Sequence, residues 1–173
     1  VLGGLAALTT PALARAEARA VLDGAGRSVR PPPQVRSVFP AGPPAAILLY
    51  TLAPELLIGW PRANRAEERA FLSPDIGARP EVGRLTGRGN SANLEVVLAL
   101  QPDLILDVGS VRETFVSLAD RVQAQTGIPY ALLDGRLDTT DHAYLTLGRL
   151  IGQEEAGRAK AAETVRLLGT VLD

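Results

Sequence analysis

The stretch from Gly87 to Gly135 decides the fold and reads GRGNSANLEVVLALQPDLILDVGSVRETFVSLADRVQAQTGIPYALLDG. The apolar run from Asp103 to Val108 has the length and composition of a strand buried on both faces. From Arg112 to Thr126, apolar residues recur at the spacing of a helix with one buried face, and a second apolar run follows from Ile128 to Leu133. Strand, helix and strand with short connections predict a right-handed βαβ unit with parallel strands.

The sequence on either side adds two strands and several helices. We predict strands from Val35 to Phe39 and from Leu56 to Trp60, joined by an apolar helix from Ala45 to Leu52. The predicted fold class is α/β, with a four-stranded parallel sheet flanked by helices on both faces and followed by the start of a long connecting helix. The predicted core consists of Val38, Ile47, Leu57, Leu94, Leu98, Leu104, Leu106, Phe115, Leu118, Val122, Ile128, Leu132 and Leu147.

The composition is that of an ordinary globular domain, with 46% hydrophobic and 21% charged residues. A formal net charge of -1 gives no general attraction to nucleic acid or to an anionic membrane surface. There is no cysteine, and the only histidine, His142, is interpreted as a surface or capping residue, so we predict no metal site. The sequence contains no Gly-x-Ser-x-Gly elbow, and nothing in it demands catalysis.

The first residues, Val1 to Ala20, are rich in alanine and leucine and contain small-x-small triplets. This pattern is typical of the end of a secretory signal peptide whose basic start is missing, and an amphipathic helix is the alternative. The first interpretation divides the chain into a signal-peptide remnant at residues 1–20, an α/β lobe at residues 21–152 and the start of a connecting helix at residues 153–173. It also indicates a periplasmic destination.

A glycine pattern supports a rival hypothesis. Gly87, Gly89 and Ala92 match the dinucleotide-binding fingerprint, and Asp107 follows at a suitable distance at the end of a predicted strand. A strand should precede these glycines, but the segment from Ser73 to Thr86 is interrupted by prolines. A nucleotide-binding, Rossmann-like enzyme domain is therefore the alternative function.

A resemblance to a known family covers most of the chain after Val35. Residues 93–106, NLEVVLALQPDLIL, closely resemble the periplasmic substrate-binding proteins for iron-siderophore complexes and cobalamin. The similarity continues in Val82-Gly83-Arg84, in residues 126–129, in Leu133-Asp134 and in residues 147–152. In that family two α/β lobes are joined by one long helix, and the ligand is held between them. The chain resembles the N-terminal lobe and the beginning of that helix.

The resemblance implies a non-enzymatic, periplasmic solute-binding component of an ABC importer. Such a protein captures an iron-siderophore or similar iron chelate and delivers it to a membrane permease; cobalamin, haem or an oxyanion such as molybdate are alternative ligands. The expected partners are therefore this ligand and the inner-membrane permease, with no cofactor and no nucleic acid. We expect the protein to be a monomer.

Loops at the carboxyl ends of the predicted strands supply the candidate ligand-binding residues, because open α/β sheets bind ligands at that edge. Their arginines could form a positive rim for an anionic chelate, and the alternative is that each arginine is solvated or paired with a nearby acid. Trp60 is interpreted either as packing at the rim of the sheet or as a ligand contact. The candidates are Ala41, Gly42, Trp60, Arg62, Arg84, Arg88, Ser110 and Arg136.

Glu95 is the candidate docking residue. Its place in the first turn of a predicted helix suits the helix dipole, which is sufficient to explain an acid there. By resemblance, however, it is the surface acid with which such proteins contact arginines of the permease. We expect its side chain to point toward solvent.

Overall fold

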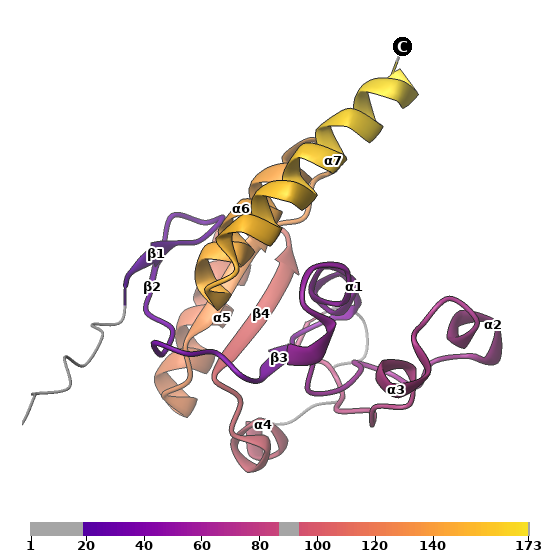
Figure 1. Cartoon of the computed structure of the whole chain (residues 1–173). Coiled ribbons are helices and arrows are strands. Elements are labelled where there is room, and N and C mark those ends of the chain that lie inside the picture. Colours follow the sequence, from indigo (N-terminus) through magenta and orange to yellow (C-terminus); the bar gives the residue numbers. More distant parts are fainter. Residues whose placement is uncertain (1–18, 87–93, 173) are drawn as a thin grey trace, which may run out of the picture.

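A parallel sheet in the strand order β3-β4-β5 lies at the centre of the fold (Figure 1). The structure is a computed structural model, which describes residues 19–86 and 94–172. Strand β3 is Val38–Pro40, β4 is Leu104–Gly109 and β5 is Tyr130–Asp134. Both pairings are parallel, with Val38 opposite Leu104 and Ile105 opposite Tyr130. The predicted βαβ unit is confirmed.

The predicted strand from Leu56 to Trp60 is wrong. Pro54–Leu56 form a short 3-10 helix, and Leu57 makes only an isolated parallel bridge to Val38. The backbone N–H of Trp60 donates to the carbonyl oxygen of Pro80, and the carbonyl oxygen of Trp60 accepts the N–H of Val82, both at 2.8 Å. These groups therefore do not extend the sheet. These residues are apolar because they are buried, and burial does not require a continuous ladder.

The predicted strand from Val35 to Phe39 is displaced toward its C-terminal end. The backbone N–H groups of Arg36 and Ser37 donate to a carboxylate oxygen of Asp103, at 2.7 and 3.1 Å. These donors are therefore satisfied by a side chain, and regular strand pairing begins only at Val38.

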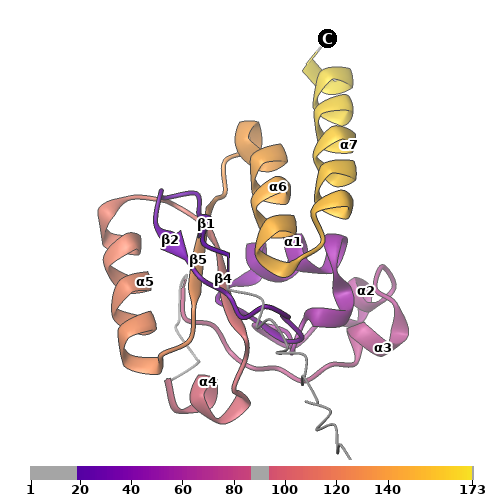
Figure 2. The same cartoon turned by 60° about the vertical axis from the view of Figure 1, so that its left-hand side comes forward.

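Helices cover both faces of the sheet, as predicted. Figure 2 shows α5 on one side and α1 and α6 on the other. The side chains of the strands pack on both faces of the sheet. Val38, Leu104 and Leu106 pack with α1 and α6 on one face. Ile105 and Tyr130 pack with α4 and α5 on the other face. The helices are α1 Pro43–Leu52, α2 Ala66–Arg69, α3 Pro74–Gly77, α4 Leu94–Leu100, α5 Glu113–Thr126, α6 Thr140–Ile151 and α7 Glu154–Leu172, with a second 3-10 turn at Leu137–Thr139.

An antiparallel strand pair, β1 (Val21–Leu22) with β2 (Ser28–Val29), precedes the sheet and was not predicted. The buried Asp23 joins this hairpin to β5. Its carboxylate accepts the backbone N–H of Leu132 at 3.1 Å and pairs with the guanidinium of Arg27 at 3.0 Å. The β1–β2 hairpin is therefore anchored on the core.

Helix α7 extends away from the body of the molecule, with the C-terminus at its far end (Figure 1). The turn before it is sharp because Gly152 ends α6 in the left-handed conformation, with φ of 73°. Gly127 ends α5 in the same way, with φ of 71°. Among the described residues, no helix combines the length and apolar character that crossing a membrane requires.

Most of the predicted core is buried, and two of its members are not. Ile47 on α1 is 54% exposed and Leu98 on α4 is 45% exposed, so their assignment to the core is wrong. Ile47 lines a surface pocket beside α1, and α4 is a short helix of which only Val97 is buried. Residues Val38, Leu57, Leu104, Leu106, Val122, Leu132 and Leu147 are confirmed as buried, and Leu94, Phe115, Leu118 and Ile128 are partly buried.

Candidate ligand-binding site

Three hollows adjoin one another along the carboxyl edge of the sheet. The apolar pocket, of about 250 Å³, lies between α1 and the segment around α2. It shares Pro43 with the central hollow, of about 200 Å³, whose walls include Gly42, Thr86 and Asp107. Gly109 and Ser110 line both the central hollow and the arginine hollow, of about 620 Å³, which also contains Arg112, Asp134 and Arg136.

The parallel strands bring most of the sequence-predicted residues to this edge. Gly42 and Ser110 line the central hollow, Trp60 and Arg62 line the apolar pocket, and Arg136 lines the arginine hollow. Ala41 is buried beside them, where its carbonyl oxygen accepts the backbone N–H groups of Leu85 and Thr86. Arg84 is half-buried in the same connection, and Arg88 lies outside the described residues.

Two of the three arginines in the walls of these hollows, Arg62 and Arg136, are paired with acids. Arg62 donates two hydrogen bonds to the carboxylate of Glu68, at 2.8 and 2.6 Å. These bonds are the main reason why the pKa of Glu68 is lowered to about 2. Arg136 donates to Asp134 at 3.0 Å and also lies 3.8 Å from Asp138. At these two positions the predicted positive charge is therefore balanced locally.

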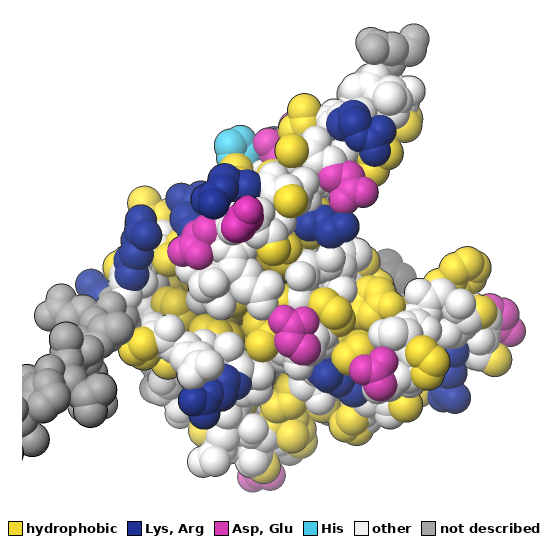
Figure 3. Space-filling model, viewed as in Figure 1, with side chains coloured by type: hydrophobic (Ala, Val, Ile, Leu, Met, Phe, Trp, Pro, Cys, Tyr) yellow, Lys and Arg dark blue, Asp and Glu magenta, His cyan; other side chains and the backbone are white. Residues whose placement is uncertain are grey.

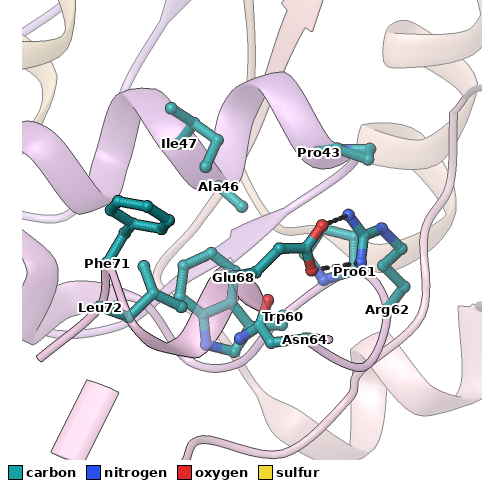
Figure 4. Close-up of a pocket in the computed structure, with 10 residues that line it drawn as sticks. All are labelled: Pro43, Ala46, Ile47, Trp60, Pro61, Arg62, Asn64, Glu68, Phe71 and Leu72. Atoms are coloured by element: carbon teal, nitrogen blue, oxygen red, sulfur yellow. Dashed lines mark hydrogen bonds and ion pairs between the residues drawn. The ribbon is translucent and has the colours of Figure 1, made fainter. Parts of the chain in front are cut away.

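Trp60 packs at the rim of the sheet, which is one of the two interpretations that the sequence left open, and it also lines a pocket. Its side chain is only 4% exposed, and its indole N–H donates to the carbonyl oxygen of Ile76 at 2.8 Å. The ring also lies 5.9 Å from the ring of Tyr50. Trp60 is thus a packed core residue whose ring nevertheless forms part of the wall of the apolar pocket (Figure 4).

Asp107 is a buried acid that holds two hydroxyl groups. Its carboxylate accepts hydrogen bonds from Tyr130 at 3.0 Å and from Thr86 at 3.1 Å. Burial raises the pKa of Asp107, and these hydrogen bonds partly oppose that effect. Sequence reasoning did not find these partners, which are 23 and 21 residues away and show no local pattern.

Glu95 and His142 are both exposed on the surface of the molecule. Glu95 is exposed on α4, as expected, while Val97 of the same helix is fully buried. The side chain of His142 is 76% exposed on α6, so it is a surface residue as predicted. Within the described part of the chain, no group of three or more histidine or acidic side chains is arranged to hold a metal ion.

No family model and no curated protein sequence matches the chain, but solved structures do. An ABC transporter solute-binding protein from Sulfurospirillum deleyianum superposes with a TM-score of 0.70 at 24% identity, over 84% of this chain and 46% of that one. The molybdate periplasmic binding protein of Haemophilus influenzae gives 0.62 at 16% identity, over 80% and 48%. SirA of Staphylococcus aureus, complexed with staphyloferrin B, gives 0.60 at 17% identity, over 82% and 44%.

These similarities define the class of fold. The chain has the α/β fold of part of an ABC-transporter solute-binding protein, and the fold that the sequence resemblance implied is confirmed. The chain spans about half the length of the structures that it matches. One of these structures holds molybdate and another holds staphyloferrin B, so the shared fold is compatible with chemically different ligands.

Proposed function

We propose that the chain is the ligand-binding lobe of a periplasmic solute-binding component of an ABC importer. It captures an iron-siderophore or similar ferric chelate and delivers it to a membrane permease. The observation that carries this proposal is the row of adjoining hollows at the carboxyl edge of the sheet, in a fold shared with such binding proteins. A cleft between two lobes needs a concave surface of this kind on each lobe.

The proposal includes the division of the chain. In this proposal residues 21–152 form the lobe, residues 153–173 belong to the connecting helix, and residues 1–20 belong to a signal peptide. Exposed apolar side chains on α7, namely Val165, Leu167 and Val171, support a connecting role because a second lobe would cover them (Figure 3).

The nucleotide-binding alternative is less well supported. Its acid, Asp107, would have to accept hydrogen bonds from a ribose, but its carboxylate already accepts them from Tyr130 and Thr86 inside the protein. The residues before the glycines, Leu85 and Thr86, form a bend instead of the strand that the fingerprint requires. Gly87 and Gly89 themselves lie outside the described residues.

Native mass spectrometry of the full-length protein tests the proposed function. The protein is incubated with a mixture of ferric siderophores, cobalamin, haemin, molybdate and NAD, and the retained species are identified by mass. We expect a ferric chelate to be retained. Retention of NAD with none of the other compounds would overturn the proposal in favour of the nucleotide-binding alternative.

Ligand capture and permease docking should respond to different substitutions. Arg136→Ala removes a guanidinium from the wall of the arginine hollow and leaves the carboxylates of Asp134 and Asp138 without their counter-charge, so we expect the affinity for an anionic ferric chelate to fall about tenfold. Glu95→Arg reverses an exposed charge on α4 and should weaken permease binding by like-charge repulsion while leaving ligand affinity unchanged. Calorimetry measures the first quantity, and binding to permease in nanodiscs measures the second.

Glu155→Arg is the matched control for the docking variant, because Glu155 is an exposed acid on α7. It should change neither ligand affinity nor permease binding. If Glu95→Arg loses ligand affinity and still binds the permease normally, the roles assigned to Glu95 and Arg136 are wrong.

A further inference from the structure

The apolar pocket has walls of ring faces and aliphatic carbon. Pro43, Ala46 and Ile47 come from α1, Trp60 forms the floor, and Phe71 and Leu72 follow α2 (Figure 4). Two of these side chains are unusually open for their type, since Ile47 is 54% and Phe71 86% exposed. Apolar side chains gather over α1 and the neighbouring α2–α3 segment in Figure 3. Contiguous exposed apolar surface of this kind marks a binding site.

The two charges in the pocket wall neutralise one another. Arg62 and Glu68 form a two-pronged ion pair, and Arg62 also donates to the carbonyl oxygen of Ala63 at 3.0 Å. Glu68 additionally accepts the backbone N–H of Arg65 at 2.9 Å. Because its pKa is lowered to about 2, Glu68 stays ionised at any physiological pH. An anionic group that approached the guanidinium would meet the carboxylate of Glu68 and would have to compete with it.

Two nitrogen donors in the wall of the pocket are directed to the protein. The indole N–H of Trp60 donates to Ile76, and the side-chain amide of Asn64 donates to the carbonyl oxygen of Gly77 at 3.4 Å. Trp60 therefore offers a ring to the pocket and not a hydrogen-bond donor. Aromatic rings pack well on such surfaces in offset or edge-to-face geometry.

We infer that the apolar pocket binds an uncharged aromatic ring carried by the ligand, and that it does not recognise the anionic part of that ligand. The inference rests on the proposed function and narrows its ligand class to organic chelates with a neutral ring, in preference to a bare oxyanion. The volume of about 250 Å³ agrees with this, because whole drug-sized ligands occupy pockets of about 300–1,000 Å³. The pocket therefore holds one arm of a larger molecule.

The indole N–H signal of Trp60 provides a local test by NMR in the full-length protein, after assignment with Trp60→Phe. Benzyl alcohol, benzoate, benzylammonium and molybdate serve as probes, because the first three differ in charge on the same ring. We expect benzyl alcohol to shift the signal saturably, with a dissociation constant at least about fivefold lower than that of either charged analogue. A lower dissociation constant for benzoate or molybdate than for benzyl alcohol would overturn the inference.

Variants of the walls connect this signal to the pocket. Phe71→Ser and Ile47→Ser should each weaken benzyl alcohol binding about threefold or more, because they remove exposed apolar surface. The matched control is Leu137→Ser, which removes a 70% exposed leucine outside the pocket and should change nothing. Thermal midpoints should be similar in all three variants because none of these side chains is buried. Unchanged binding in both pocket variants contradicts the inference.

Glu68→Gln tests the charge argument separately. Glutamine keeps an oxygen that can accept the N–H of Arg65, but it leaves the guanidinium of Arg62 without its counter-charge. Benzoate affinity should then rise about tenfold while benzyl alcohol affinity stays the same. No gain for benzoate would show that the ion pair does not set the preference for a neutral ring.

The inference and the proposed function can fail independently. If the full-length protein retains a ferric chelate and Phe71→Ser and Ile47→Ser bind it with unchanged affinity, the pocket inference fails and the proposed function stands. If benzyl alcohol binds at Trp60 as expected but only NAD is retained in the mass-spectrometric screen, the pocket binds rings and the proposed function fails.

Discussion

Gly157→Ala should lower the free energy of unfolding by about 1–3 kcal/mol, although alanine is the better helix former. The reason is the close approach of α6 and α7. A Cβ atom at Gly157 would lie 2.8 Å from the carbonyl oxygen of Tyr144 and 3.1 Å from the Cα atom of Gly148. Both are backbone atoms, so the strain can be relieved only by moving the two helices apart. Urea denaturation measures the loss.

Gly169→Ala is the matched control on the same helix. Gly169 is exposed, and a Cβ atom there would meet nothing within 4 Å. This variant should gain stability by up to about 1 kcal/mol from helix propensity alone. If Gly157→Ala is stabilised as much as Gly169→Ala, the approach of α6 and α7 leaves room for a methyl group and the steric argument is wrong.

Asp107→Ala should lower the free energy of unfolding by about 2–4 kcal/mol. The substitution removes the acceptor of two hydroxyl groups, those of the fully buried Tyr130 and of Thr86. Each buried hydroxyl without an acceptor costs about 1–3 kcal/mol, and relief of the desolvated charge offsets part of the sum. Asp107→Asn is the control, because its amide keeps one oxygen acceptor and its NH2 group can donate to the oxygen of the other hydroxyl, and it should lose about 1 kcal/mol or less.

Loss of stability in Asp107→Asn as large as in Asp107→Ala would show that a side chain with one acceptor oxygen does not hold the two hydroxyl groups. Equal stability of Asp107→Ala and the wild type would show that Tyr130 and Thr86 find other partners. Denaturant curves with far-ultraviolet circular dichroism measure both variants under the same conditions.

The same carboxyl group should make stability depend on pH with a definite sign. Burial raises the pKa of Asp107 in the folded chain, whereas the unfolded chain has the ordinary pKa of about 3.9. The folded state therefore holds this proton more tightly, so the contribution of Asp107 to stability is greatest below about pH 4 and is lost as the pH rises through the raised pKa. Glu68 acts in the opposite direction, because its lowered pKa contributes stability that is lost as the pH falls toward about 2.

Comparison of the wild type with Asp107→Asn isolates this effect, since Glu68 is common to both proteins. The free energy of unfolding of the variant, relative to that of the wild type, should increase between about pH 4 and the raised pKa and then remain constant. A relative stability that falls over this interval would mean that the hydrogen bonds from Tyr130 and Thr86 outweigh burial.

Local pattern was sufficient for the central βαβ unit. Strands β4 and β5 begin within two residues of the predicted positions, and Gly127 and Gly152 end their helices as expected. Apolar periodicity and helix-stop glycines act over a few neighbouring residues, so the sequence shows them directly. The predicted strand at residues 56–60 is wrong because an apolar run indicates burial and does not by itself indicate strand pairing. Pairing depends on which backbone groups lie opposite one another. The backbone groups of Trp60 bond to Pro80 and Val82.

For the candidate site, the sequence by itself determined which residues lie at the carboxyl edge of the sheet. The tertiary structure decided which of the side chains there are paired, buried or exposed. Parallel strands must end at the same edge of a sheet, so Gly42, Ser110 and Arg136 were expected there together. The tertiary structure decided three features that no local sequence pattern shows. Arg62 pairs with Glu68, and Asp107 accepts hydrogen bonds from Tyr130 and Thr86. Phe71 and Ile47 are exposed. Hydrogen bonds and pockets require positions within a fraction of an ångström, which only the packed chain defines.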